Sequence, residues 1–234
     1  MTTDPPRTAR ERARQEVMAA ILEAGRRELA ERGADGLSLR AVAREVGMVS
    51  SAVYRYVASR DDLLTALISE AYGAVADAAE HAASARTTPG RRFVRLCGAL
   101  RTWGQEHPHE YALLYGSPVP GYHAPEATTD IATRTPRAAA ALVQEAYDAG
   151  TLEVHEPGPP LGRVLAGQCA AMGEALGMSV PEPVVLRLAQ AWTQVYGAIS
   201  FELFGQLRNT FDPADAFAAH TFATAARHVG FTDL

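Results

Sequence analysis

The chain has 234 residues, enough for one large domain or two smaller ones with a sizeable core. Its composition, 47% hydrophobic and 21% charged, is that of an ordinary globular protein, and no run approaches the roughly 18 apolar residues of a membrane span. The formal net charge of −5 excludes a nonspecific DNA-coating protein, which would be more basic. The arginine-rich N-terminus lacks the apolar core of a secretory signal, so we expect a cytoplasmic protein.

Charge is distributed unevenly along the chain. Residues 1–60 carry 11 Arg against 8 acidic residues, a formal +3, and residues 61–234 carry 11 Arg against 19 acidic residues, a formal −8. All the basic residues are arginine, so each can form two parallel hydrogen bonds. A basic N-terminal part on an acidic body predicts a phosphate-binding head whose remainder does not touch nucleic acid.

The N-terminal third predicts four helices. Apolar residues at helical spacing predict a helix over 10–32, which Gly33 ends. Ser38 is the expected N-cap of a short helix over 39–45, and a second short helix is expected over 50–57 after a turn at Gly47. Ser59 is the expected cap of a long helix that reaches about residue 81.

The rest of the chain also reads as helix. Helices are expected from the Pro89-Gly90 break to Pro108, over 110–115, up to Gly150, and over 161–176, 183–208 and 213–229. Pro136 falls within the first turn of one helix or kinks it; residues 116–125 are the clearest loop and 156–160 a rigid linker. We therefore expect an all-α fold of about nine to ten helices, with a three-helix domain over 1–61 and a larger helical bundle over 62–234.

The two short helices around Gly47 have the form of a helix-turn-helix, in which the second helix enters the major groove of DNA. The segment 30–64 resembles the DNA-binding segment of the TetR family of transcriptional regulators. Matching positions occur at fixed spacing and are Glu31 to Gly33, Gly36, Ser38, Leu39, Ala43, Gly47, Val53, Tyr54, Tyr56, Ser59, Arg60 and Leu63. The rest matches only in length, helical content and helix order, besides a stretch over 192–205 similar to a Trp-His-Gly subgroup, in which Tyr196 replaces the histidine.

Three residues depart from the family pattern in this segment. Val49 replaces the serine that usually caps the recognition helix, so Ser50 is expected to take over the cap. Ser51 replaces the usual small Gly or Pro. Val57 replaces phenylalanine, which predicts a thinner apolar contact between the recognition helix and the next helix.

The resemblance implies a homodimeric DNA-binding repressor that a small molecule releases. Phosphate contacts are implied for Ser38, Arg40, Tyr54, Tyr56 and Arg60, and base contacts for Ser50, Ser51, Ala52 and Arg55. Arg55 is the expected specific reader, because arginine can bind guanine O6 and N7 together. The alternatives are that Tyr54 belongs to the core, that Arg55 contacts only phosphate, and that the arginines at 7, 10, 12 and 14 form a solvated tail rather than a DNA-binding arm.

The resemblance also places the dimer contact on the helices over 161–176 and 183–208, where the apolar residues are too many for one stripe. Interface candidates are Leu165, Cys169, Leu188, Val195, Ile199 and Leu203; a wide core within one chain is the alternative. A ligand cage with an apolar wall and a few polar groups would be lined by Tyr72, Leu100, Trp103, His107, Tyr111, Tyr115, Met172, Trp192 and Tyr196. Ordinary core packing is the alternative for each, His107 in particular.

Other chemistries find little support in the sequence. Cys97 and Cys169 lack metal-site spacing and read as buried apolar residues, with a redox pair as the alternative. No metal or cofactor is expected, and no Glu-x-x-His, HExxH, GxSxG or glycine-rich phosphate loop occurs, so a helical-bundle enzyme is the weaker reading. A DNA-binding regulator without an effector is the other alternative.

Overall fold

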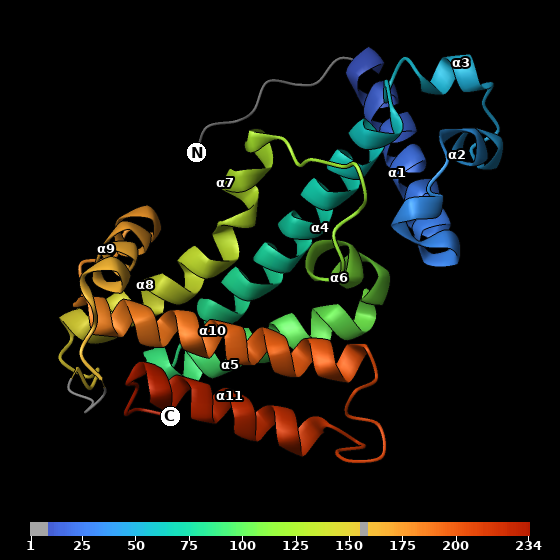
Figure 1. The fold of residues 1–234 in the computed structure, drawn as a ribbon. Helices are drawn as coiled ribbons and strands as arrows, with labels where there is room; N and C mark the ends of the chain where they lie inside the picture. The colour runs from blue at the N-terminus through green and yellow to red at the C-terminus, as the bar shows by residue number, and fades with distance from the viewer. Residues whose placement is uncertain (1–8, 155–158) are drawn as a thin grey trace. The chain divides into compact units, whose positions relative to one another are not determined.

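The computed structural model describes residues 9–154 and 159–234, and within them the chain forms eleven α-helices (Figure 1). Arg7, the first arginine of the predicted arm, lies outside these residues. So does most of the linker predicted over 156–160, of which only residues 159 and 160 are described. The helices and one 3-10 turn are, in chain order, α1 (Ala9–Gly36), α2 (Leu39–Glu45), α3 (Ser50–Val53), α4 (Arg60–Ala83), α5 (Pro89–Glu106), α6 (Pro108–Tyr115), η1 (Glu126–Thr128), α7 (Thr129–Ala132), α8 (Arg134–Asp148), α9 (Arg163–Leu176), α10 (Glu182–Leu203) and α11 (Asp215–Val229).

The predicted all-α fold is confirmed, with local differences at helix ends. The additional helix is α7, a single turn that follows the loop after α6. Pro136 lies in the first turn of α8, where a missing N–H costs no hydrogen bond. α10 ends at Leu203 rather than near 208, because Gly205 adopts a positive φ of 80° and turns the chain.

The chain packs as two compact units. The first contains residues up to Ala71 together with His109–Thr128, and the second contains Tyr72–Pro108 and Thr129–Leu234. The first unit extends past the predicted boundary at residue 61 because Leu63, Leu64 and Leu67 of α4 are part of its hydrophobic core. The loop after α6 also belongs to it, since Val119 and Tyr122 pack against that core.

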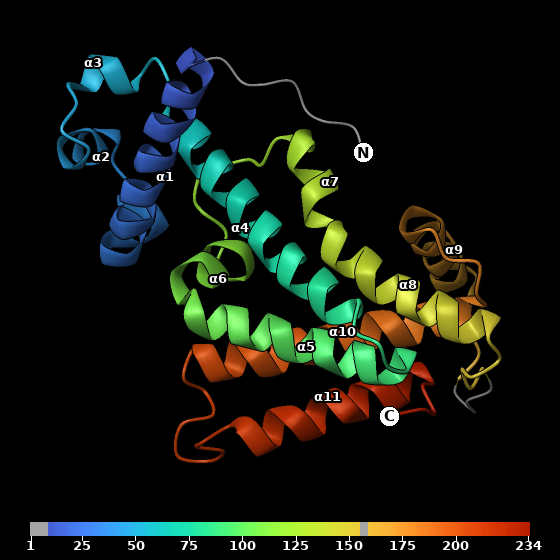
Figure 2. The ribbon, with the colours of Figure 1, turned by 180° about the vertical axis from the view of Figure 1, so that it is seen from behind.

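The core of the first unit comes from α1 to α4. α1 presents Ile21, Leu22 and Ala24, and α2 and α3 close over them with Leu39, Val42 and Val53. In both views α2 and α3 lie on one side of α1 (Figures 1 and 2). These apolar residues recur at helical spacing, so each helix buries one stripe and leaves the opposite face to solvent.

In the second unit α10 and α11 lie side by side, and α5 packs against α8, α10 and α11 (Figure 2). The helices contribute fully buried side chains such as Phe93, Leu100, Leu142, Val195 and Phe222. Arg101 of α5 ties the end of α10 to the start of α11, with hydrogen bonds of 2.6 Å to each carboxylate oxygen of Glu202 and 2.9 Å to Asp215. None of the described helices is both long and apolar enough to cross a membrane.

Candidate nucleic-acid interface

The helix-turn-helix begins where α1 breaks. Gly33 has φ 69° and ψ 175°, outside the helical region, and separates the long part of α1 from its last residues. α2 then begins at Leu39, with Ser38 in the extended conformation of an N-cap but without a side-chain capping bond. The predicted bounds of α2 and the stop at Gly33 are therefore confirmed, and the cap of α2 is positional only.

The turn between α2 and α3 depends on Gly47. Its φ of 69° is left-handed, a region that costs residues with a Cβ about 1–2 kcal/mol. The amide of Met48 donates to the carbonyl of Ala43 at 2.9 Å, and the amide of Gly47 donates to that of Arg44 at 3.2 Å. This closed turn sets the angle between the two helices.

The recognition helix α3 is shorter than predicted. The regular helix covers Ser50–Val53, and the chain continues to Val57 in tighter turns, with the amide of Tyr56 donating to the carbonyl of Val53 at 2.8 Å. The prediction that Ser50 caps this helix was wrong, because Val49 occupies the cap position and has no side-chain hydrogen-bonding group. Val57 is buried in the core despite its smaller size.

The outer side of α3 and of the turn that follows it is open to solvent. Ser51, Tyr54 and Arg55 are exposed, and Tyr54 shows 47% of its surface. Tyr54 is therefore not a core residue, and the phosphate role remains for it. Tyr56 is half-buried against the core, and the Arg14 guanidinium of α1 lies 5.3 Å from the centre of its ring.

The remaining DNA-contact candidates lie on α3 itself and at the starts of α2 and α4. Arg40 is exposed near the start of α2, and Ser38, Ser50 and Ala52 are half-buried. Ser59 caps α4 as predicted, since its Oγ accepts a hydrogen bond of 3.0 Å from the amide of Asp62. Arg60 is half-buried and donates to the carbonyl of Ala34 at 2.7 Å, a contact the sequence did not suggest.

Within the first unit, ion pairs join α1 to α2 and to α4. Arg27 of α1 pairs with Glu45 at the end of α2, and this hydrogen bond raises the pKa of the Arg27 guanidinium above its ordinary value. Arg26 pairs with Glu70 of α4 at 2.5 Å. These contacts join residues 18 and 44 positions apart, and sequence reasoning missed them because nothing local signals such pairs.

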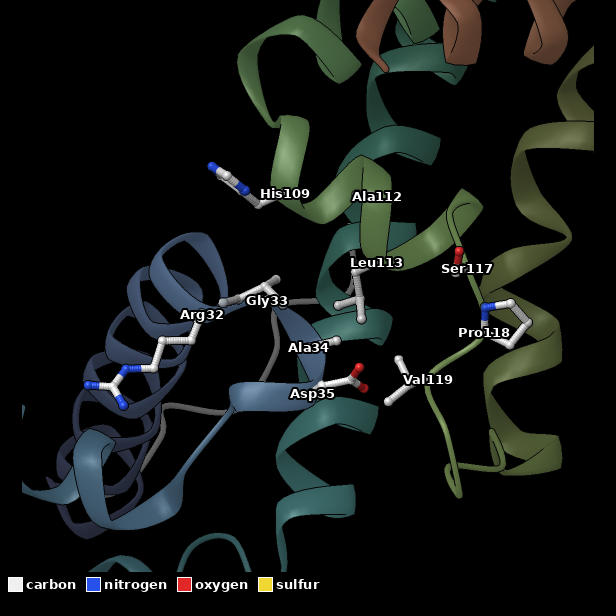
Figure 3. Close-up of a pocket in the computed structure, with 11 residues that line it drawn as sticks. Arg32, Gly33, Ala34, Asp35, His109, Ala112, Leu113, Ser117, Pro118 and Val119 are labelled. Carbon is white, nitrogen blue, oxygen red and sulfur yellow. The ribbon is translucent and has the colours of Figure 1, made fainter. Parts of the chain in front are cut away.

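A pocket of about 260 Å³ lies on the same unit, between the end of α1 and the segment of α6 and the loop that follows it (Figure 3). Leu113 and Val119 approach Ala34 on its inner side, and the Asp35 carboxylate points toward Val119. The Arg32 guanidinium points away and pairs with Glu28 at 3.2 Å. The pocket is mainly apolar, and sequence reasoning did not predict it.

The predicted ligand-cage residues are divided between the units. Tyr111 and Tyr115 belong to the first unit, with ring centres 4.9 Å apart and ring planes tilted by 53°, whereas the other seven belong to the second. Leu100, Trp103 and Tyr111 are buried, and the rest are half-buried. Within the second unit Trp103 lies 5.4 Å from His107 and Trp192 lies 5.2 Å from Tyr196, ring centre to ring centre. The Trp103 indole N–H is buried without a hydrogen-bond acceptor among the described residues.

The predicted dimer residues divide by exposure. Leu188, Val195 and Ile199 are at most 2% exposed, so their side chains face the core of their own unit. The expectation that these three residues face a partner is corrected accordingly. Cys169 is buried as well, Leu203 is half-buried and Leu165 is exposed. The large apolar residues of α9 and α10 that are exposed are Leu165 itself, Val164 and Phe201. When a helix carries apolar residues on two faces, the spacing of those residues in the sequence does not show which face is buried.

Comparisons with known proteins agree with this geometry. The family described as bacterial regulatory proteins of the tetR family matches residues 21–67, and a tetracyclin repressor-like C-terminal domain matches residues 93–224. The HTH-type transcriptional regulator Rv1816 of Mycobacterium tuberculosis is 40% identical over 214 residues, which are 89% of this chain and 91% of the relative.

Solved structures share the fold. The crystal structure of the regulatory protein SCO4313, 32% identical, covers 95% of this chain and 98% of its own, with a TM-score of 0.74. RolR, solved in complex with its ligand resorcinol, is 17% identical and resembles this chain in fold alone, with a TM-score of 0.55 over 95% of this chain and 91% of its own. An exposed recognition helix on a buried three-helix core, matched over both halves of the chain, shows that the protein belongs to the TetR family of transcriptional regulators, with a DNA-binding helix-turn-helix.

Proposed function

We propose that the protein is a homodimeric repressor, acting in the cytoplasm, that leaves its operator when a small and mostly apolar ligand binds. The observation that carries the DNA-binding part is the exposed surface formed by Ser51 of α3 and by Tyr54 and Arg55 in the turn that follows it, on a segment anchored in the buried core by Val53 and Val57. In this proposal Arg55 reads a guanine, and Arg40, Tyr54 and Tyr56 contact phosphates.

Two copies are needed because one helix-turn-helix reads too few base pairs for a specific site. Val164 and Phe201 are 75% and 56% exposed, values that are high for large apolar side chains on the two helices the family uses for assembly. We assign the dimer contact to this exposed face of α9 and α10. Of the residues that the sequence suggested, Leu165 remains in this interface, and Val164 and Phe201 take the place of the buried ones.

The ligand part is supported by Trp103. A buried indole N–H without an acceptor loses a hydrogen bond it would make in water, and an acceptor atom on a ligand would restore it. The neighbouring His107 ring and the apolar Leu100 would supply a polar group and a wall for the same ligand. The resorcinol complex of RolR is an instance of such binding in the same fold.

The test is operator selection from a random duplex pool with the purified full-length protein, followed by titration at two salt concentrations. The proposal expects one site bound per protein dimer, steep salt dependence, and an Arg55→Ala variant that loses about 1–3 kcal/mol of discrimination at one base pair. Enrichment of no sequence by the wild-type protein would refute the regulator described here.

The ligand is tested separately by screening small phenols and aliphatic and aromatic carboxylates for release of the selected duplex. Tryptophan fluorescence reports binding, since the chain has two tryptophans, Trp103 and Trp192. A Trp103→Phe variant should keep its DNA affinity and lose ligand response. Phe211→Leu, at an exposed aromatic residue outside the predicted cage, is the control and should keep both. A protein that binds its operator and responds to no compound of the screen would instead be a regulator without an effector.

A further inference from the structure

Arg60 is the first residue of α4, and its side chain reaches back to the end of α1. Its Nη2 donates to the carbonyl oxygen of Ala34 at 2.7 Å, and its Nη1 lies 3.5 Å from the Asp61 carboxylate. The side chain is 33% exposed. A charged donor on a backbone carbonyl is among the stronger protein hydrogen bonds, and this one is partly shielded from water.

This hydrogen bond closes a loop that contains the whole helix-turn-helix. Ala34 lies just after the break of α1 at Gly33 and just before α2, and Arg60 lies just after α3. The chain between them carries α2, the turn at Gly47 and α3. The acceptor is a backbone atom, so the contact fixes the path of the chain as it enters the helix-turn-helix.

A second contact joins the same segment to α1, where Arg27 of α1 pairs with Glu45 at the end of α2. The pair is exposed, with 51% and 35% of the two side chains open to solvent, and contributes correspondingly little. α3 itself is a single turn without a side-chain cap, so its orientation depends on the buried Val53 and on what holds its flanks.

We propose that Arg60 is a positioning residue for DNA recognition: it fixes the helix-turn-helix on α1 and so orients α3, rather than neutralising a phosphate. The N–H group that points at Ala34 cannot donate to a phosphate at the same time. Breaking the bond would leave the partly buried Ala34 carbonyl with only the longer hydrogen bond of 3.4 Å from the Leu37 amide. The proposal rests on the DNA-binding function and adds a role that the family resemblance does not give.

The two roles of an arginine differ in their salt dependence. Each phosphate contact releases about 0.9 counterion, so losing one contact in each copy of a dimer would flatten the plot of log K against log salt by about 1.8. A positioning residue leaves this slope unchanged. It instead lowers the ratio of affinities for the selected operator and for a duplex with one altered base pair, because a tilted α3 misplaces its base contacts.

The experiment compares wild type, Arg60→Met and Arg60→Lys in the full-length protein. Arg40→Met is the reference for a lost phosphate contact, because the exposed Arg40 is assigned that role above and its loss should flatten the salt slope. The probes are the duplex selected by the wild-type protein and the same duplex with one base pair changed. Affinity is measured at four salt concentrations, and thermal melting reports folding. Lysine keeps one donor for the Ala34 carbonyl, so Arg60→Lys should recover most of the discrimination.

We expect Arg60→Met to bind the operator about tenfold to hundredfold more weakly, with the wild-type salt slope and a reduced operator preference. A slope flattened by about 1.8 with intact preference would overturn the proposal and make Arg60 a phosphate contact. Loss of melting temperature alone, with wild-type affinity and preference in the folded protein, would also overturn it. If Arg60→Met does not fold, the same readouts on Arg60→Lys decide. Failure of the wild type to select any duplex would refute the proposed function instead.

Discussion

Tyr122 donates a hydrogen bond to Thr65 across 57 positions of the sequence, with 3.0 Å between the two oxygens. The direction follows from hydrogen count, because the single hydroxyl hydrogen of Thr65 is directed to the carbonyl of Asp61 at 2.8 Å. The loop after α6 is thereby joined to the first turns of α4. A segment that looks like a solvent-exposed connection is part of the DNA-binding unit.

A Tyr122→Phe substitution removes only this donor and keeps the ring. We expect it to lower the free energy of unfolding of the first unit by about 1 kcal/mol, as for a typical partly buried hydrogen bond. Chemical denaturation followed by circular dichroism measures this loss. The exposed neighbour His123 is the control: His123→Ala should leave stability within about 0.5 kcal/mol, and an equal loss in both variants would contradict the contact.

Two glycines should respond in opposite directions to alanine. No atom lies within 4 Å of a Cβ added at Gly47, so Gly47→Ala is strained only by the φ of 69° and should cost about 1–2 kcal/mol of stability. Gly98 lies inside α5 with equally open space and a helical backbone, so Gly98→Ala should stabilise by about 0.5–1 kcal/mol. Thermal melts of both variants test this, and a shift of the same sign in the two would be inconsistent with it.

The Arg101–Glu202 pair should matter more than the Arg134–Glu80 pair. The side chains of Arg101 and Glu202 are 14% and 16% exposed, against 34% and 43% for Arg134 and Glu80. Removing Arg101 leaves the Glu202 carboxylate partly desolvated, so Arg101→Met should cost roughly 2–3 kcal/mol, and Arg134→Met less than about 1 kcal/mol.

Urea denaturation measures both losses. The double variant Arg101→Met, Glu202→Met should regain much of the stability that Arg101→Met loses, because the mostly buried Glu202 carboxylate is no longer left without its arginine. Asp215, the other partner of Arg101, is exposed and remains solvated. Equal costs for Arg101→Met and Arg134→Met would show that burial does not set the strength of these pairs.

The thiol of Cys97 should make stability fall at alkaline pH. Burial raises the pKa of Cys97 above its ordinary value of 9.0, so the folded state keeps the proton that the unfolded state releases. The free energy of unfolding is therefore unaffected by titration of this thiol below about pH 9. Above about pH 9 it falls by up to about 1.4 kcal/mol per pH unit. The chain has no lysine, which leaves few competing titrations between pH 8 and 9.5.

Denaturation at a series of pH values, compared between wild type and Cys97→Ala, isolates this effect. The variant should be less stable at pH 7 and show a shallower decline above pH 9. Parallel curves for the two proteins would contradict the buried, protonated thiol. Burial also raises the pKa of Cys169, so neither native thiol should react quickly with a disulfide reagent at neutral pH.

Phe201 should be required for assembly if the exposed face of α10 meets a second copy. Phe201→Glu places a charge at an exposed apolar position, so we expect monomers by light scattering without loss of helical content. Phe211→Glu is the matched control, because Phe211 is 50% exposed but stacks on Phe217 at 4.6 Å beyond the end of α10. A dimer that persists in Phe201→Glu would move the interface elsewhere.

The sequence by itself determined the helices and the recognition unit. The stop at Gly33, the bounds of α2, the turn at Gly47 and the cap at Ser59 depend on backbone conformation and nearest neighbours, which are local properties of a residue. Apolar spacing likewise identified most of the core, because a helix buries residues that recur every three to four positions.

Only the tertiary structure decided which residues meet across long stretches of chain. The contacts of Arg60 with Ala34 and of Tyr122 with Thr65 depend on how helices pack, and their partners carry no local signal. The inward face of α10 is a similar case, since Val195 and Ile199 differ from exposed Phe201 in direction and not in hydrophobicity. Hydrophobicity is a property of the residue, whereas facing a core is a property of the packed chain.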